Sequence, residues 1–334
     1  AFTVKVTVSK NKIEKIEYPD NLETIGVGKV ALDKLSKKII DRQSLGVDNV
    51  TGATITSFAL KGAVKKALEQ AKVSKADMAK LMKNSETSTA LPSELKTNVV
   101  VVGGGGSGLA SAIAAQQAGA KVIVLEKLGI LGGSTNVSEG ALNAADPQRQ
   151  GKQGIEDSIQ KHYEQTMKGG HNIGNPELVH YLTDHALESV HWLESIGVKF
   201  KDEVGTATGA LWQRSHYPAT PSGNTYIRSF EKYIAAHGND MDAVSLIQDK
   251  AGRVIGVIAK DNHTGKTTKF MADKGVILAT GGFGANVALR QKVNTGVFKD
   301  YDLGKGIGCT NFNKSAQGSG IIMGEKVGAH VIGM

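Results

Sequence analysis

The sequence predicts an α/β protein, with a doubly wound parallel sheet in its larger part and a small α+β domain before it. The main evidence is residues 99–102, four consecutive valines that are typical of a strand buried on both faces of a parallel sheet. These valines lead directly into a glycine-rich segment at residues 103–108, and a second apolar strand with a glycine-rich end lies at residues 276–279. Alternating apolar and polar residues within residues 2–18 indicate the smaller domain.

Composition allows two or three domains with a real core, since the chain has 334 residues, of which 40% are hydrophobic. The formal net charge of +8 is spread along the chain, which favours solvated helix faces and attraction of small anions or acidic redox partners. The single cysteine, Cys309, excludes a disulfide framework within this chain. No apolar run reaches the roughly 18 residues that a membrane-spanning helix needs. We therefore expect no nucleic-acid partner and no membrane span.

The first 80 residues predict a hairpin and two helices. After the alternating hairpin segment, apolar residues at helical spacing predict helices over residues 28–41 and about 57–73. The small, polar segment VDNVTGATITS, residues 47–57, forms the turn between them. A segment rich in Ser and Thr follows, so we divide the chain into residues 1–80, a linker at 81–97, and a second domain at 98–334. Within that domain, Asn175, Pro176 and Gly197 mark the ends of a helix over about 175–196.

The valine strand and the segment after it form a dinucleotide-binding fingerprint. Gly103, Gly105 and Gly108 have the spacing G-x-G-x-x-G, a helix follows, and the next strand ends at Glu126, 18 residues beyond the last glycine. The glycines allow a tight turn, close approach of the backbone to a pyrophosphate, and close packing of helix on strand, while the acid accepts hydrogen bonds from ribose. The alternative is a glycine-rich turn in an unrelated α/β fold.

Two further segments favour FAD over a nicotinamide dinucleotide. Residues 132–135, Gly-Gly-Ser-Thr, follow Glu126 closely and add small residues and hydroxyls near the phosphates. The downstream strand ends in Thr280-Gly281-Gly282, which brings a second backbone segment beside the same nucleotide. An FAD that lies extended through a domain needs both segments. For the second segment, an ordinary turn at a strand end is the alternative.

On these motifs, residues 98–334 resemble the FAD domain of the fumarate reductase/succinate dehydrogenase flavoprotein superfamily, in particular its soluble fumarate and urocanate reductases. The segments that carry the resemblance are residues 99–127, GGSTNVSEGALNAA, RSHYPA, ATGGFGAN and GSGIIMGEKVGAHVIGM. Residues 1–75 resemble the FMN-binding domain often fused to such reductases, because residues 48–54 match its flavinylation pattern D-x-x-[ST]-G-A-[ST]. The resemblance implies covalent FMN, in a phosphoester with the hydroxyl of Thr54. The alternative is that Thr51, Thr54 and Thr56 cap the following helix.

The resemblance also implies non-covalent FAD, because GGSTNVSEG contains no histidine that would carry it. By position in the motifs, Ser107 and Glu126 contact the FAD phosphates and ribose, and Thr280 and Gly281 close the other side of the flavin. The remaining FAD contacts expected from the motifs are Gly103, Gly105, Gly108, Gly133, Ser134, Thr135, Gly140, Ala141 and Asn143.

The chain departs from the family pattern in two of its motifs. Gly318-Ser319-Gly320 stands where relatives have Gly-Asp-Gly, so a carboxylate contact is absent or replaced by a hydroxyl. Relatives also carry a strand that contacts adenine before residues matching 243–257, whereas HGNDMDAV leaves almost nothing between helix and strand. Val244 is therefore only a weak candidate for the adenine contact.

Catalytic residues are not assigned in this chain. In the family, the substrate site lies between the FAD domain and a capping domain, and its acids, histidines and proton-donating arginine lie beyond the position matching Met334. We therefore expect the chain to stop within or before the capping domain. Arg214 and His216 are the candidates for a place near the flavin, with a structural ion pair as the alternative. No metal site is expected, because the histidines at 180, 185 and 191 do not have the spacing that converges on one metal.

The resemblance implies a two-flavin oxidoreductase that passes electrons from FMN to FAD and then, as hydride, to a small α,β-unsaturated carboxylate. Urocanate is favoured, with fumarate or acrylate next. It also implies a flavin transferase for maturation, a cytochrome or other redox donor, and a periplasmic or cell-surface location, with the cytoplasm as the alternative. The rival functions are a dehydrogenase or oxidase of the aspartate oxidase or ketosteroid dehydrogenase type, and a flavin electron-transfer module without its own substrate.

Overall fold

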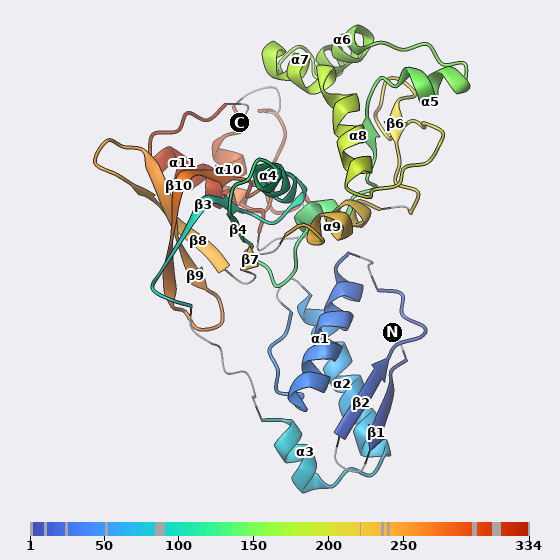
Figure 1. The fold of residues 1–334 in the computed structure, drawn as a ribbon, viewed down its shortest axis with the longest axis vertical. Coiled ribbons are helices and arrows are strands. Elements are labelled where there is room, and N and C mark those ends of the chain that lie inside the picture. Colours follow the sequence, from blue (N-terminus) through green and yellow to red (C-terminus); the bar gives the residue numbers. More distant parts are fainter. Residues whose placement is uncertain are drawn as a thin grey trace. The chain divides into compact units, whose positions relative to one another are not determined.

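The computed structural model describes residues 3–9, 12–23, 26–50, 53–83, 91–220, 222–234, 237–238, 241–295, 299–308 and 315–332. Thr51, Gly52 and Cys309 lie outside the described residues, as does the side chain of Thr54. The chain forms two compact units (Figure 1). The first unit consists of Ala1–Ser134 and Ala236–His330, and the second of Thr135–Ala235 and Val331–Met334.

The N-terminal part of the first unit is a hairpin with helices packed on it (Figure 1). Strands β1 (Lys5–Ser9) and β2 (Lys12–Glu17) pair antiparallel, α1 (Gly28–Arg42) packs against β2, and α2 (Thr54–Gln70) packs against β1. A short helix, α3 (Lys75–Leu81), follows and is capped by Ser74. The buried apolar residues that hold this part together include Ile13, Ile16, Leu32, Leu35, Ile39, Leu60, Val64 and Leu68. The predicted hairpin and helices are confirmed, although the second helix begins at Thr54 and not near Ser57.

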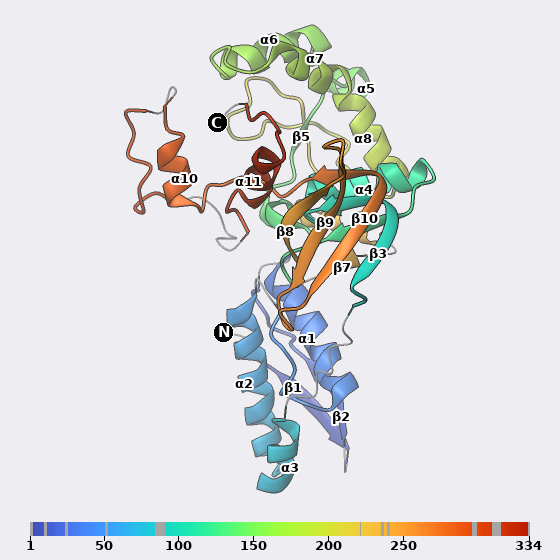
Figure 2. The same ribbon diagram turned by 90° about the vertical axis from the view of Figure 1, so that its left-hand side faces the viewer.

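The rest of the first unit is built on a six-stranded sheet with the order β7-β4-β3-β10-β9-β8 (Figure 2). Its strands are β3 (Glu94–Val102), β4 (Val122–Leu125), β7 (His237–Gly238), β8 (Met241–Gln248), β9 (Val254–Asp261) and β10 (Thr267–Leu278). β3 pairs in parallel with β4 and β10, and β4 pairs in parallel with β7, whereas β8, β9 and β10 pair antiparallel. The predicted parallel sheet around the valine strand is confirmed and has an antiparallel edge.

The centre of this sheet is β3, where Val100 and Val101 are fully buried. α4 (Gly106–Gln117) packs against β3, β4 and β10, and α11 (Ser319–Lys326) packs against β8. A further helix, α10 (Val287–Lys292), follows β10 in the chain. β3 begins at Glu94, earlier than the valine pattern predicts, because Glu94–Thr97 pair with residues 269–272 of β10. Part of the segment predicted as linker is therefore strand.

The second unit is mostly helical, with one two-stranded sheet. Its elements are β5 (Leu142–Asn143), α5 (Pro147–Lys152), α6 (Ile159–Gly169), α7 (Pro176–Asp184), α8 (Ala186–Ser195), β6 (Ser215–His216) and α9 (Asn224–Glu231). The single helix predicted over 175–196 is wrong in one respect, since it is interrupted at His185 and forms α7 and α8. Its predicted ends are confirmed: the Asn175 side chain caps α7, and Gly197 has a φ of 95°.

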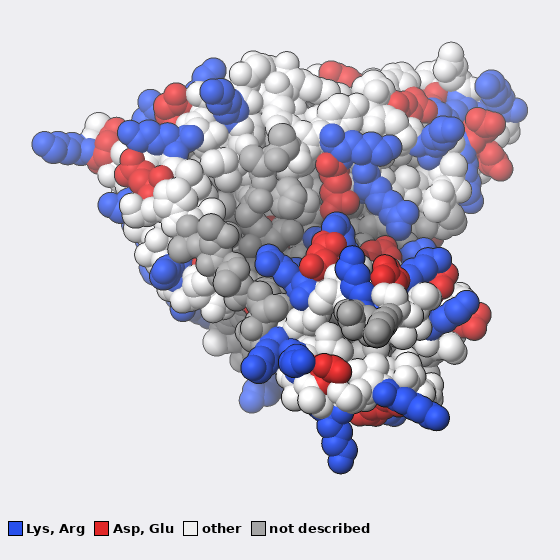
Figure 3. Space-filling model, turned by 60° about the horizontal axis from the view of Figure 1, so that its bottom comes forward, with Lys and Arg blue, Asp and Glu red and all other residues white. Residues whose placement is uncertain are grey.

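Charged side chains are mixed over the molecular face drawn in Figure 3, where Lys and Arg alternate with Asp and Glu. This distribution agrees with the spread of charge along the sequence. Among the described helices, none combines the length and apolar composition needed to cross a bilayer.

Candidate flavin-binding site

The glycine-rich turn between β3 and α4 has no space for side chains at two positions. Gly103 has a φ of 106°, and a Cβ there would lie 2.3 Å from the carbonyl oxygen of Ala279. A Cβ on Gly108 would lie 1.9 Å from the carbonyl oxygen of Gly103. The end of β3, the first turn of α4 and the end of β10 can meet this closely only because both residues are glycine.

Gly105, in contrast, faces open space. An added Cβ there would meet only the carbonyl oxygen of Gly132, at 4.0 Å. Gly105 is the N-cap of α4, and no side chain caps this helix. Gly132 has a φ of 108°, and its N–H donates to the carbonyl of Gly104 over 2.6 Å. The uncapped N-terminus and the bare backbone around it form a cradle that fits an anionic diphosphate, which the helix dipole stabilises.

Glu126 holds this turn from inside the protein. Its Oε2 accepts the N–H of Gly104 over 2.7 Å, and its Oε1 accepts the N–H of Leu128 over 2.8 Å. The residue is only 6% exposed and follows the last residue of β4. The carboxylate therefore lies at the turn, and the ribose contact remains a prediction.

The end of β10 lies beside the same turn, because the N–H of Ala279 donates to the carbonyl of Val102 over 2.8 Å. Gly281 has a φ of 74°, and an added Cβ would meet no atom within 4 Å. At Gly320 of α11, a Cβ would lie 2.1 Å from Oγ1 of Thr280, so this helix packs directly on the strand end. Thr280 and Gly281 therefore lie at the same carboxyl edge of the sheet as the glycine turn.

The remaining predicted contacts of the first unit lie near these segments. Ser107 is exposed on the first turn of α4, and Gly133 and Ser134 begin the short 3₁₀ helix η1 (Gly133–Val137). The strand β8 starts next to Glu126, because the N–H of Met241 donates to the Glu126 carbonyl over 2.9 Å. Val244, three residues further, is 46% exposed and has no opposite residue in the register with β9.

Within the second unit, the predicted flavin-lining strand pairs with the RSHYPA segment. Leu142 of β5 lies opposite His216 of β6, and the Ser215 hydroxyl donates to Asn143 Oδ1 over 2.6 Å. Gly140 has a φ of 83°, and Ala141 is half-buried. The carbonyl of Thr135 accepts the hydroxyl of Ser138 over 2.9 Å. These contacts fix the backbone that precedes Asn143.

Arg214 and His216 are both buried, at 3% and 1% exposure. Arg214 donates from Nε and Nη2 to the two carboxylate oxygens of Asp157, over 2.8 and 2.7 Å. Nε2 of His216 lies 3.1 Å from Oδ2 of Asp146. Both side chains are thus paired with acids inside the second unit. This is the arrangement predicted by the alternative interpretation, in which they form structural ion pairs.

The acidic partners were not predicted from the sequence. Burial alone would raise the pKa of the Asp146 carboxyl, but hydrogen bonds from Arg149, His216 and the Gln148 backbone outweigh burial and lower it to about 2. Burial likewise opposes ionisation of Asp157, yet the Arg214 guanidinium lowers its pKa. The sequence did carry a signal for Asp146, because Asp before Pro147 is a helix N-cap pattern. In the structure, its Oδ1 accepts the N–H groups of Gln148 and Arg149.

A mixed sheet with a glycine-lined anion cradle at the carboxyl ends of its parallel strands defines a dinucleotide-binding α/β domain. Comparison with known families identifies which one. Residues 98–334 match the FAD binding domain family, and residues 1–69 match the FMN-binding domain family. The chain belongs to the FAD binding domain family and carries an FMN-binding domain before it, so the predicted membership is confirmed.

Known relatives match most or nearly all of the chain. The chain is 36% identical to the urocanate reductase of Eggerthella lenta, over 99% of the chain and 54% of that protein. It is 30% identical to the NADH:acrylate oxidoreductase of Vibrio harveyi, over 99% of the chain and 38% of that protein. A flavocytochrome c3 fumarate reductase in its open conformation superposes with a TM-score of 0.62 at 32% identity, over 72% of this chain and 41% of that chain. The chain therefore spans about half, or less, of the length of these relatives.

Replacing Gly108 with Ala should lower the free energy of unfolding by about 1–3 kcal/mol, because the added methyl group would overlap the Gly103 carbonyl. Gly275→Ala is the matched control, since this glycine lies in β10 and an added Cβ meets no atom within 4 Å. Its effect should stay within about 0.5 kcal/mol. Urea denaturation compares the two variants, and equal stabilities would contradict the close packing.

Replacing Asp146 with Asn tests the buried acid. Its folded-state pKa of about 2 lies below the ordinary 3.8, so the charged form adds stability that is complete above the unfolded-state pKa and is lost as pH falls through the folded-state pKa. Between pH 5 and 2, the unfolding free energy of the wild type should fall by about 2 kcal/mol more than that of D146N. Urea denaturation at several pH values measures this difference. The exposed-site control D184N should follow the wild type.

Proposed function

We propose that this chain is the flavin-carrying part of a two-flavin reductase that acts on the C=C bond of a small α,β-unsaturated carboxylate. The observation that carries the proposal is the match of one chain to an FMN-binding and an FAD binding domain, together with 99% coverage by a urocanate reductase at 36% identity. Among the relatives, the urocanate reductase has the higher identity and the acrylate oxidoreductase the lower. Urocanate is therefore the favoured substrate, before fumarate and acrylate.

FMN and FAD, once bound, would supply the redox chemistry, which is electron transfer between the flavins and hydride transfer to the acid. In this chain, the N-terminus of α4 and the bare backbone of Gly105 would hold the FAD diphosphate, and Glu126 would keep the turn in shape. The backbone at Gly281 would approach the cofactor from the other strand. Arg214 and His216 are not assigned the proton-donor role, because their polar groups are buried against Asp157 and Asp146.

Covalent FMN at Thr54 has support from the backbone around it. Thr54 is the first residue of α2, whose N-cap is Ala53, and no side chain among the described residues caps this N-terminus. The Thr56 hydroxyl donates to Glu23 over 3.0 Å, so Thr56, one of the three threonines in the alternative interpretation, does not cap the helix, while Thr51 and the Thr54 side chain lie outside the described residues. A phosphoester on Thr54 would lie at the positive end of the α2 dipole, which stabilises its negative charge.

The proposal includes partners and a location. A flavin transferase would attach FMN to Thr54, and a cytochrome or another redox protein would supply electrons. A periplasmic or cell-surface location suits a carrier flavin that is bound covalently and is not lost by dilution.

Thr54→Ala should abolish covalent flavin, because the acceptor hydroxyl is removed. The protein is produced together with a flavin transferase, and its intact mass is measured after acid precipitation. The wild type should carry one FMN, less the water lost in ester formation, and T54A should carry none. The control Thr56→Ala removes a neighbouring hydroxyl and should keep the mass increase. A flavin that stays attached in T54A would place the ester elsewhere.

Turnover with a reduced dye tests the substrate class in the full-length protein. We expect reduction of urocanate at a higher kcat/KM than fumarate or acrylate. A different order would change the favoured acid and leave the reaction class in place. No turnover of any of the three acids by protein that holds both flavins would contradict the proposed reaction.

A further inference from the structure

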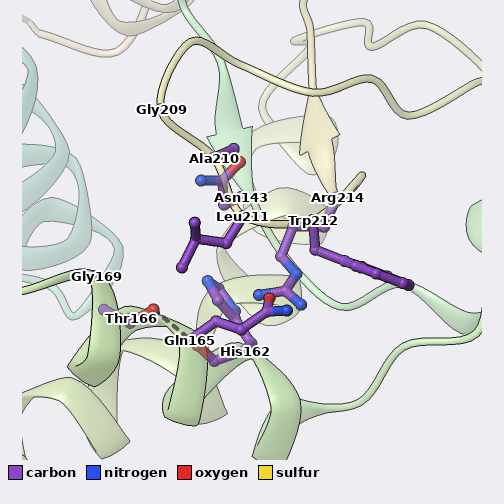
Figure 4. Close-up of a pocket in the computed structure, with 10 residues that line it drawn as sticks. All are labelled: Asn143, His162, Gln165, Thr166, Gly169, Gly209, Ala210, Leu211, Trp212 and Arg214. Atoms are coloured by element: carbon purple, nitrogen blue, oxygen red, sulfur yellow. Dashed lines mark hydrogen bonds between the residues drawn. The ribbon is translucent and has the colours of Figure 1, made fainter.

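A pocket of about 230 Å³ lies within the second unit, between α6 and the loop that leads into β6 (Figure 4). His162, Gln165 and Thr166 line it from α6, and Leu211 and Arg214 line it from the loop. An engineered protein cavity of about 150 Å³ holds benzene, so this pocket has room for a single ring or a short acid. Asn143, one of the residues expected to line the flavin, also lines this pocket, whereas Ser107 and Glu126 do not.

Two polar side chains in this pocket each have a buried atom with no hydrogen-bond partner among the described residues. His162 is only 5% exposed, yet its Nδ1 is buried without a hydrogen bond, and so is Oε1 of Gln165. Within the described part of the chain, no other ring or amide atom of these two side chains is hydrogen-bonded. Residues three apart on a helix share one face, and buried polar groups in native proteins are normally paired. These two unpaired atoms therefore mark a place where a polar ligand can bind.

The charges around the pocket favour an acceptor group on that ligand. Burial, and then the charge of Arg214, lower the pKa of His162 to about 4, so the ring is neutral at pH 7 and carries one N–H donor. Nε and Nη2 of Arg214 are taken by Asp157, but Nη1 makes no hydrogen bond with any described residue. Figure 4 shows His162 and Gln165 reaching from α6 toward the Arg214 guanidinium. His162 and Arg214 therefore offer N–H donors to one region. The unpaired atom of Gln165 is the acceptor Oε1, and a half-turn of the amide brings its Nε2 to the same place, so that this side chain donates there as well.

We propose that this pocket binds a small monocarboxylic acid, with the carboxylate on His162, Gln165 and Arg214 and the hydrocarbon part against Leu211. A carboxylate has only acceptors and forms its stronger hydrogen bonds with charged donors. Asp157 neutralises most of the Arg214 charge, so the site suits a single negative charge more than a diacid. The proposal uses residues of the second unit alone and does not depend on the proposed reaction.

Propionate is a suitable probe because it has no C=C bond to reduce. The full-length oxidised protein, with ¹⁵N-labelled histidine and no electron donor, is titrated while the ring nitrogens of His162 are followed by NMR. Propionate should give a saturable shift, and propionamide, its neutral isostere, should bind about tenfold more weakly, as expected for loss of a charge-assisted hydrogen bond. Absence of a saturable shift, or equal affinity for the two probes, would overturn the proposal.

A pair of variants assigns the binding to the pocket. Gln165→Leu removes the amide and should weaken propionate binding about tenfold. Gln160→Leu is the matched control, because this glutamine lies on the same helix, is exposed, and donates its amide to Glu164. It should leave the propionate affinity unchanged. Equal effects of both variants, or none from Gln165→Leu, would place the binding elsewhere.

Discussion

The meeting of three backbone segments at Gly103 and Gly108 is the constraint on which the FAD domain depends. The end of β3, the first turn of α4 and the end of β10 lie so close that no side chain fits between them. This contact directs the uncapped N-terminus of α4 toward the carboxyl edge of the parallel strands. The packing of α11 on Thr280 extends the same arrangement to the chain's last described helix. The groups that could bind a diphosphate at the carboxyl edge of the sheet are thus placed there by the close packing of the backbone.

Most of the fold could be predicted because its signals are local. The valine strand, the glycine spacing and the N-terminal alternation each report burial within a few residues, and the hairpin and the parallel strands are where these signals place them. The early start of β3 could not be predicted, since Glu94–Thr97 become strand only by pairing with residues 269–272. The interruption of the helix at His185 likewise has no glycine or proline to announce it. Such features depend on partners that are distant in the sequence.

The candidate site likewise contains residues that could be predicted from local sequence and residues whose roles depend on distant partners. The glycines could be named from their spacing, because spacing reflects backbone conformation directly. The positions of Arg214 and His216 relative to their acids could not, since the bonds join residues 57 and 70 positions apart. The sequence therefore singled out these two side chains as candidates for a place near the flavin. It did not show that their polar groups pair with Asp157 and Asp146. The pocket beside His162 and Gln165 gave no sequence signal at all.

Glu126 has a further consequence through its two backbone hydrogen bonds. With Gly104 and Leu128 both held by one buried carboxylate, the phosphate cradle is assembled by folding itself and not by the nucleotide. A loop of four adjacent glycines would otherwise lose much freedom on binding. A domain with such a cradle should take up FAD without refolding, which would make loading with chemically altered FAD analogues a practical route to probing this chain.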